Sequence, residues 1–505
     1  MKRFALAAGS GVLLALAFPE PHWSLLAWVA LVPLLAVALE VRPTAAFGWG
    51  FLQGAVFYGI TLQWLFTFFR GYGGMTVWES AGVLGLMVAV LSAFTGAYTL
   101  GVRAMRRAGF GWALALSPFL WTALELGRTR MPVIGFPWNL LGYAVSDHLG
   151  LVQMVTVTGI YGLSFVVAGY NALVLWAWRE RRGRPVWAWA GATAALLLAG
   201  FVGGRLVPKP QGRYTAHLIQ LNLAPKTEYS ADWDVRHAAE LHALDALSIA
   251  AGQAAPGLVI WPEAPAPFSM QDPAFAARAR KIARESRSDF LAGVDEYSYP
   301  PGQAAQAYNS AVMLDPAGQQ TFRYDKIHLV PFGEYVPWRK WLTFAGPLIG
   351  GIGDFTPGTR RAIGRLPGGT FAVFICYEAV FPNEVRQFAE RGADLLINIS
   401  DDGWYGRSEA LEQHVNMARV RAVENRRWLL RDTNTGITLV VDPYGRIRAR
   451  LAAGTRAALT ASYDFRSGRT PYARWGDWLP KLAALVSCLA LAWSFAGRGR
   501  PSQGK

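Results

Sequence analysis

Long apolar runs dominate the first two hundred residues of the chain and return once near its end. They cover about 4–18, 24–40, 45–69, 76–101, 109–126, 150–178, 185–203 and 478–495. A helix needs roughly 20 apolar residues to cross the hydrocarbon core of a bilayer, and most of these runs approach or exceed that length. The pattern predicts a multi-pass α-helical membrane domain with about eight spans, seven within 1–208 and the last within 476–505.

The first run is short and follows Met1-Lys2-Arg3, so it also has features of a signal peptide. No small-residue cleavage site comes after it, because the chain continues through Phe18-Pro19-Glu20-Pro21 into the next apolar run. We therefore favour a first membrane span over a cleaved leader.

Residues from about 209 to 475 follow a different pattern, in which short β-type runs alternate with amphipathic stretches. Strands are expected at 216–223, 257–261, 290–294, 310–314, 371–375, 395–399 and 437–441, and helices at 234–250, 273–287, 382–391 and 409–426. Such alternation predicts an α/β domain. Two Asp-Pro-x-Gly segments, at 315–318 and 442–445, predict hairpin turns, since Pro presets φ and Gly accepts a positive φ.

Composition agrees with a membrane protein. The 505 residues are 52% hydrophobic and 16% charged, whereas soluble domains average about 25% charged. The net charge of +15 does not indicate nucleic-acid binding, because the basic residues of the first half lie in short gaps between apolar runs. The chain has two cysteines, Cys376 and Cys488, which are too few for a disulfide framework.

The distribution of Lys and Arg predicts the orientation. With the N-terminus inside, thirteen basic residues fall in inside segments and three in the short outside loops, and the positive-inside rule favours this arrangement. The inside residues are Lys2, Arg3, Arg42, Arg103, Arg106, Arg107, Arg179, Arg181, Arg182, Arg184, Arg498, Arg500 and Lys505, against Arg70, Arg128 and Arg130 outside. Both termini are then cytoplasmic and the α/β domain is extracytoplasmic.

Three polar sites in the α/β domain carry candidate chemistry. Glu263 follows an expected strand directly, and Cys376 lies at an expected strand-to-helix elbow. Lys326 is embedded among apolar residues, with Glu334 eight positions later. Functional side chains in α/β folds gather past the carboxyl ends of strands. Taken separately, a solvated loop glutamate and a buried structural cysteine are equally ordinary explanations, and we assign Cys488 to the second.

The combination of these residues points to acyl transfer. A thiol nucleophile needs a base, which Glu263 supplies, and the oxyanion needs a cation or N–H donors, which Lys326 and the elbow supply. His328 is an alternative base, but it lies inside the lysine segment. No zinc-ligand spacing, phosphate-binding loop or serine elbow motif appears in the sequence, so no cofactor or metal is expected.

At these positions the domain resembles the nitrilase, or carbon–nitrogen hydrolase, superfamily, and the whole chain resembles the bacterial apolipoprotein N-acyltransferase family. The resemblance rests on Trp261-Pro262-Glu263, Tyr308-Asn309-Ser310-Ala311, Asp325-Lys326 with 329–337 (LVPFGEYVP), Cys376-Tyr377-Glu378, 402–406 (DGWYG) and Asn434-Thr435-Gly436-Ile437. It implies a four-layer α-β-β-α sandwich attached to a membrane base of about eight spans.

The resemblance also implies the reaction and its residues. An acyl chain passes from a membrane phospholipid to Cys376 as a thioester, and then to the α-amino group of an apolipoprotein's diacylglyceryl-cysteine. Glu263 is the base, while Lys326 and the Tyr377 N–H stabilise the oxyanion. Glu334 orients Lys326 and Glu263, and Glu378 holds the elbow or a lipid head group. The implied location is the bacterial cytoplasmic (inner) membrane.

The sequence departs from the family pattern at two places. Asp401 stands where the family has Asn, which leaves its role open. The family also has a functional tryptophan after the Gln-x-Asn strand end, and either Trp233 or Tyr229 occupies that place here.

Two further segments are candidates for substrate access. The stretch 343–355 is apolar and rich in glycine, and its Phe344, Leu348 and Ile349 are expected to gate lipid entry unless they pack on the domain core. Trp138, in the outside loop 127–149, is either an interfacial anchor or part of a rim for lipid access.

Two other functions compete with acyl transfer between lipids. One is a membrane-tethered nitrilase or amidase that hydrolyses a small extracytoplasmic amide, although a soluble substrate gives no reason for eight spans. The other is a transporter or an inactive scaffold. The expected spans carry few charged residues, notably Glu79 and Glu125, and the intact Glu-Lys-Cys set disfavours a scaffold.

Overall fold

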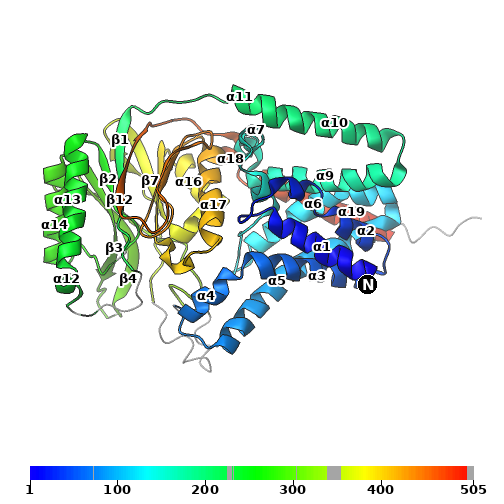
Figure 1. Cartoon of the computed structure of the whole chain (residues 1–505), viewed down its shortest axis with the longest axis horizontal. Helices are drawn as coiled ribbons and strands as arrows, with labels where there is room; N and C mark the ends of the chain where they lie inside the picture. Colours follow the sequence, from blue (N-terminus) through cyan, green and yellow to red (C-terminus); the bar gives the residue numbers. More distant parts are fainter. Residues whose placement is uncertain are drawn as a thin grey trace, which may run out of the picture. The chain divides into compact units, whose positions relative to one another are not determined.

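The computed structural model describes residues 1–71, 73–224, 230, 232–264, 266–302, 304–337 and 354–496. The chain folds as two compact units (Figure 1). Residues 1–66, 76–207 and 475–505 form the first, which we call the helical unit. Residues 67–75 and 208–474 form the second, which we call the α/β unit.

Each apolar run of the sequence coincides with one helix or with a broken helix. The longer helices are α1 (Lys2–Leu16), α3 (Pro43–Thr61), α5 (Val77–Met105), α6 (Phe110–Thr129), α9 (Ile160–Glu180), α10 (Arg184–Leu198) and α19 (Trp478–Ala496). The shorter ones are η1 (Ser24–Trp28), α2 (Val32–Ala38), α4 (Trp64–Gly71), α7 (Leu149–Val152) and α8 (Val155–Thr158).

Among the described residues, four helical stretches are long and apolar enough to cross a membrane: Val77–Ala108, Ile160–Glu180, Arg184–Leu206 and Trp478–Phe495. A fifth results if α3 and α4, which meet at a bend of 56°, are one broken span. The expected count of about eight is therefore not confirmed. Helix α1 has 15 residues, and the run 24–40 breaks into the 3₁₀ turn η1 and the short helix α2. An apolar run in sequence need not be one continuous helix.

The break between η1 and α2 leaves backbone groups without helical partners, and a buried side chain satisfies them. Asn171 of α9 accepts a hydrogen bond from the Leu31 N–H at 2.8 Å and donates to the Ala27 carbonyl at 2.8 Å. Irregular backbone at membrane depth is tolerated where protein groups satisfy it in this way. Asn171 therefore joins the broken segment to α9.

Small residues let α3 and α5 pack closely. A Cβ added at Gly50 would lie 2.4 Å from the Thr95 carbonyl oxygen, so a larger side chain would push the two helices apart. The Thr99 hydroxyl of α5 donates to the Ala46 carbonyl of α3 at 2.8 Å. Small residues with hydroxyl hydrogen bonds are a usual means of helix association in membranes.

The α/β unit contains two six-stranded mixed sheets, with strand orders β12-β1-β2-β3-β4-β5 and β11-β10-β9-β8-β7-β6. The first sheet comprises β1 (Tyr214–Gln220), β2 (Leu258–Ile260), β3 (Asp289–Ser298), β4 (Gln306–Leu314), β5 (Gln320–Asp325) and β12 (Ala457–Tyr463). The second comprises β6 (Gly364–Leu366), β7 (Gly369–Ile375), β8 (Leu395–Ser400), β9 (Trp428–Thr433), β10 (Leu439–Val441) and β11 (Ile447–Arg450).

Helices cover the outer face of each sheet, which gives four layers (Figure 1). Helices α13 (Ala238–Ala254) and α14 (Pro273–Ser286) pack on the first sheet, and α16 (Pro382–Glu390) and α17 (Ala410–Asn425) on the second. Strand β1 contacts β9 and β4 contacts β7, so the sheets face each other. The predicted α/β fold is confirmed, and both Asp-Pro-x-Gly segments form hairpins, β4–β5 and β10–β11.

Candidate active site

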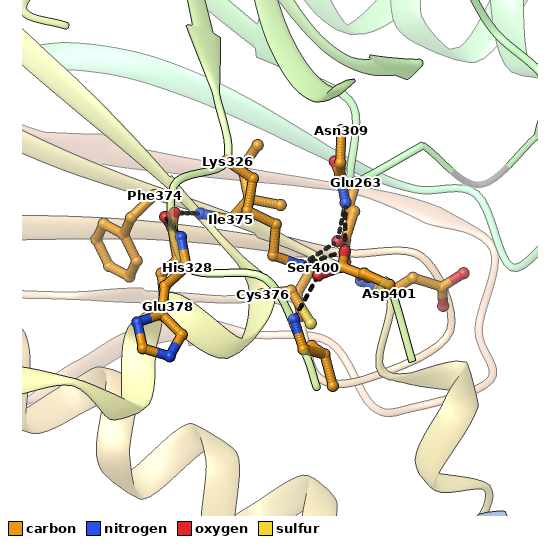
Figure 2. A network of polar contacts seen from close by, with 12 residues as sticks. Glu263, Asn309, Lys326, His328, Phe374, Ile375, Cys376, Glu378, Ser400 and Asp401 are labelled. Atoms are coloured by element: carbon orange, nitrogen blue, oxygen red, sulfur yellow. Dashed lines mark hydrogen bonds and ion pairs between the residues drawn. The ribbon is translucent and has the colours of Figure 1, made fainter. Parts of the chain in front are cut away.

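Glu263 and Lys326 meet inside the α/β unit although they come from different strand ends (Figure 2). Glu263 follows β2 and Lys326 directly follows β5. The Lys326 ammonium donates to Glu263 Oε1 at 3.0 Å, and the Lys326 backbone N–H donates to the Asn309 carbonyl at 2.9 Å. The Lys326 side chain is 1% exposed, so this is a buried ion pair.

A second carboxylate and an amide complete the group around Lys326. Glu334 Oε1 accepts from the Lys326 ammonium at 2.7 Å, and its Oε2 accepts from the Val330 N–H at 2.8 Å. Asn309 Nδ2 donates to Glu263 Oε1 at 2.7 Å and to Glu334 Oε1 at 3.0 Å. Glu334 therefore contacts Lys326 directly and shares Asn309 with Glu263. The sequence analysis named Asn309 as part of a motif but did not predict it as a site residue.

The remaining oxygen of Glu263 accepts from the backbone of the loop after β8. Asp401 donates its N–H to Glu263 Oε2 at 2.8 Å. The Asp401 side chain accepts from the Gly403 N–H and from Asn434 Nδ2, which holds the loop in place. This answers the question that the sequence left open. The backbone of Asp401 holds Glu263, and its carboxyl group fixes the loop that provides this backbone.

The charges around Lys326 decide its ionisation state. Burial alone would lower the pKa of Lys326, but the carboxylates of Glu263 and Glu334 raise it well above its usual value. The side chain is therefore a fixed ammonium ion. A buried, immobile cation of this kind can stabilise a negative charge that develops beside it.

Cys376 directly follows β7 and begins the 3₁₀ turn η6 (Cys376–Val380), with a backbone φ of +50°. The left-handed region costs a non-glycine residue roughly 1–2 kcal/mol, so the surroundings must hold it there. Burial, and then the negative charge of Glu263, raise the pKa of the Cys376 thiol well above its usual value, although Lys326 opposes them. The resting group is a thiol, and its activation requires a base.

Glu378 holds this elbow through both of its oxygens. Oε2 accepts from the Ile375 N–H at 2.7 Å. Oε1 accepts from the Tyr324 hydroxyl at 2.7 Å and from the backbone N–H groups of Ile327 and His328 at 2.9 and 3.1 Å. Glu378 is 2% exposed and joins the cysteine elbow to the lysine segment. Of its two expected roles, these contacts favour holding the elbow.

The other predicted residues have contacts of their own. Trp233 is buried in the core beside α13 and stacks on His237, and Trp138 is buried in the helical unit against Phe136 and Trp64. Tyr377 is buried, with its ring edge-on to that of Phe381. The gating candidates Phe344, Leu348 and Ile349, and also Tyr229, lie outside the described residues.

His328 contacts groups other than the thiol. Its Nδ1 lies 3.1 Å from Glu384 Oε1, and its ring stacks on Phe381 with centroids 3.8 Å apart. Within the described part of the chain, no group of three or more His, Cys, Asp or Glu side chains is arranged to hold a metal ion. The chemistry available at the site is that of a thiol, a carboxylate base and a fixed ammonium.

Comparisons with known proteins cover both units. Residues 10–173 match the family described as apolipoprotein N-acyltransferase N-terminal domain, and residues 216–470 match the carbon–nitrogen hydrolase family. An apolipoprotein N-acyltransferase of Geobacter metallireducens is 38% identical, over 94% of this chain and 92% of its own length. Relatives of the same name from Methylococcus capsulatus and Bordetella bronchiseptica are 34% and 33% identical, over 95% and 99% of this chain and 93% and 97% of their own lengths.

Solved structures are more distantly similar to part of the chain. An amidase from Nesterenkonia sp. is 21% identical and covers 54% of this chain and 95% of its own, with a TM-score of 0.39. Nit3 of Saccharomyces cerevisiae, from the nitrilase superfamily, is 20% identical and covers 51% of this chain and 93% of its own, with a TM-score of 0.37.

Proposed function

The chain belongs to the apolipoprotein N-acyltransferase family, and we propose that it transfers an acyl chain from a membrane phospholipid to the N-terminal α-amino group of an apolipoprotein's diacylglyceryl-cysteine. The observation that carries the mechanism is the buried Glu263–Lys326 pair in the same unit as the Cys376 elbow (Figure 2). Family membership favours acyl transfer over the alternative, a membrane-tethered amidase acting on a small extracytoplasmic amide.

In the first half-reaction, Cys376 takes the acyl group. Glu263 accepts the thiol proton while Sγ attacks the ester carbonyl carbon of the phospholipid, and the carbonyl electron pair becomes an oxyanion. The Lys326 ammonium and the Tyr377 N–H stabilise that oxyanion. When the tetrahedral intermediate collapses, the C–O bond breaks and the lysophospholipid leaves with the proton from Glu263. A thioester on Cys376 remains.

In the second half-reaction, the lipoprotein amine attacks the thioester carbonyl. Glu263 accepts a proton from the amine, the oxyanion forms again beside Lys326, and the C–S bond breaks. The departing Cys376 sulfur recovers its proton from Glu263, and the amide product leaves. Covalent storage on the enzyme lets two bulky lipid substrates use one site in turn, which is a ping-pong scheme.

Glu334 and Asn309 act on this chemistry through their neighbours. Glu334 holds the second side of the Lys326 ammonium, and Asn309 bridges the two carboxylates. Both are positioning residues, because they fix the base and the cation relative to each other without touching the reacting thiol.

The proposal includes a location and a topology. We place the protein in the bacterial cytoplasmic membrane with about eight crossings, both termini cytoplasmic and the catalytic unit outside the cytoplasm. Its support is the excess of basic residues in the segments assigned to the inside. The short α1 and the broken segment η1–α2 would count among the crossings, together with the longer helices.

The decisive experiment is intact-mass spectrometry of the purified protein after incubation with phosphatidylethanolamine vesicles of defined acyl chains. We expect the mass to increase by one acyl group, and hydroxylamine, which cleaves thioesters, to remove it. Cys376→Ala should abolish the adduct, while Cys488→Ala should retain it. Cys376→Ser should also lose activity, because a hydroxyl is far harder to deprotonate in this site.

The amidase alternative gives a different result in the same experiment. It predicts hydrolysis of a small soluble amide such as acetamide and no acyl adduct from vesicles. An acyl adduct that persists in Cys376→Ala would contradict the assignment of the nucleophile.

A further inference from the structure

The carbonyl group of Cys376 is held by a side chain from another element. His414, on α17, places its Nε2 3.3 Å from the Cys376 carbonyl oxygen. His414 is fully buried and lies 38 residues from Cys376 in the chain. The proposed chemistry makes no use of His414, and no motif in the sequence indicated it.

A network of buried polar side chains holds His414 on its Nδ1 side. Its Nδ1 lies 3.1 Å from Arg431 Nη2 and 3.1 Å from Asp402 Oδ1. Arg431 Nη2 donates to Asp402 Oδ2 at 2.6 Å, and the Ser400 hydroxyl donates to Asp402 Oδ1 at 2.7 Å. All four side chains are buried.

The contact with Cys376 determines which nitrogen of His414 carries the hydrogen that matters. A carbonyl oxygen can only accept, so Nε2 bears the N–H that points at Cys376. Nδ1 lies between Arg431 Nη2 and Asp402 Oδ1, and burial, and then the Arg431 guanidinium, lower the pKa of His414. Asp402 balances the charge of Arg431. The resulting relay runs from Asp402 through Arg431 and His414 to the Cys376 carbonyl.

The Cys376 carbonyl and the Tyr377 N–H belong to one planar peptide unit, in which they point in opposite directions. A hydrogen bond that fixes the carbonyl therefore fixes the direction of the N–H. Donation to the carbonyl also polarises the amide and strengthens its N–H as a donor. Glu378 holds the other side of the elbow at the Ile375 N–H, so both sides of the residue with φ +50° are held.

We propose that His414 is a positioning residue for the oxyanion, which acts by orienting and polarising the peptide between Cys376 and Tyr377 through the relay Asp402–Arg431–His414. The inference rests on the proposed acylation of Cys376. It assigns His414 no proton transfer and no contact with substrate.

The test compares two reactions of the same thiol. Acylation from phosphatidylethanolamine vesicles forms an oxyanion, whereas alkylation by iodoacetamide displaces iodide at a tetrahedral carbon and forms none. His414→Leu should slow single-turnover acylation about 100-fold, which is typical of the loss of an oxyanion donor. Its alkylation rate should stay within about threefold of wild type. A parallel fall in both rates, or unchanged acylation, would overturn the proposal.

Two amide substitutions at the same position control for misfolding of the His414→Leu variant. The Nε2 of glutamine can take the place of the histidine Nε2, whereas the shorter asparagine cannot reach the carbonyl. His414→Gln should recover most of the acylation rate and His414→Asn should not, and equal rates for the two would contradict the mechanism. If wild type itself fails to acylate, the proposed function fails. If wild type acylates and the His414 variants do so equally well, only this inference fails.

Discussion

Lys326 shares a buried site with two carboxylates, so the group carries one more negative than positive charge when all three side chains are ionised. In the proposed mechanism, uptake of the thiol proton by Glu263 removes one of those negative charges as the thiolate forms. The ammonium stays fixed throughout, held by Glu334 and by the backbone contact to Asn309. A preorganised cation needs little rearrangement when the oxyanion appears.

Asp295 adds a titratable carboxyl beside this group, opposite Asn309 in the β3–β4 ladder. Burial, and then the charges of Glu263 and Glu334, raise the pKa of Asp295 to about 7. Between about pH 4 and 7 the folded protein holds a proton that the unfolded chain releases, so this group's contribution to stability is lost as the pH rises. We predict that Asp295→Asn gains stability over wild type, by on the order of 2–4 kcal/mol above pH 7 and by little near pH 4.

Thermal unfolding in detergent at pH 5 and pH 8 measures this difference. The melting temperature of Asp295→Asn relative to wild type should be higher at pH 8 than at pH 5. Asp234→Asn, at an exposed position on α12 (Trp233–Arg236), gives the background effect of removing a carboxylate. A difference that does not change with pH would show that burial does not keep Asp295 protonated.

The site residues differ in how far the sequence could reveal them. Glu263, Lys326 and Cys376 follow strands directly, so the strand pattern and the family motifs together single them out. Asp402, His414 and Arg431 lie on three different elements and have no common spacing. Only the packing of α17 against β9 and the η6 turn brings them together, and a single sequence does not encode that contact as a pattern.

At the scale of elements, the elbow after β7 depends on one glutamate that accepts four hydrogen bonds from three segments. We predict that Glu378→Gln destabilises the α/β unit by about 2–3 kcal/mol and slows acylation. In the Glu378→Gln variant, the amide oxygen can accept from the three donors that bind Oε1 in the wild type. The amide NH₂ group then faces the Ile375 N–H, so two hydrogen-bond donors point at each other. Leaving a buried donor without an acceptor costs roughly 1–3 kcal/mol, and the cost is larger when the acceptor that was removed carried a charge.

Glu412→Gln is the matched control, because Glu412 pairs with Arg450 at a partly exposed site where such pairs contribute at most about 1 kcal/mol. Thermal unfolding and single-turnover acylation of both variants provide the measurement. Equal effects of the two substitutions would mean that Glu378 does not hold the elbow.

The sequence analysis missed five strands of the described residues; β9 is buried throughout, and the other four share a physical cause. The predicted strands are buried apolar runs, and each overlaps an observed strand. The four missed strands with a common cause are the edge strands β5, β6, β11 and β12, which carry exposed positions and mix polar with apolar residues. Their extended conformation comes from ladder hydrogen bonds to neighbouring strands, as between β1 and β12, which are far apart in the chain. Local pattern alone does not specify such pairing.

At the scale of the whole molecule, exposed apolar helices indicate a bilayer environment. The stretch Arg184–Leu206 has none of its apolar window buried within the protein, and Trp187, Leu197, Leu198 and Phe201 are exposed. An apolar surface of this extent would drive aggregation in water. The proposed reaction gives such helices a function as well, because its lipid donor and its lipoprotein acceptor would both reside in the membrane.

The direction in which the chain crosses that bilayer is the last prediction. Basic residues flanking short loops are retained on the cytoplasmic side, and here they favour cytoplasmic termini thirteen to three. An alkaline phosphatase reporter, active only outside the cytoplasm, should be active when inserted at Gly302, in the turn between β3 and β4, and inactive when fused after Lys505. A green fluorescent protein fusion after Lys505 should fluoresce, which controls for expression.

The reverse pattern would place the catalytic unit in the cytoplasm, away from exported lipoproteins. Activity at both positions would mean that the number of crossings between them is even, which the proposed single crossing by α19 does not allow.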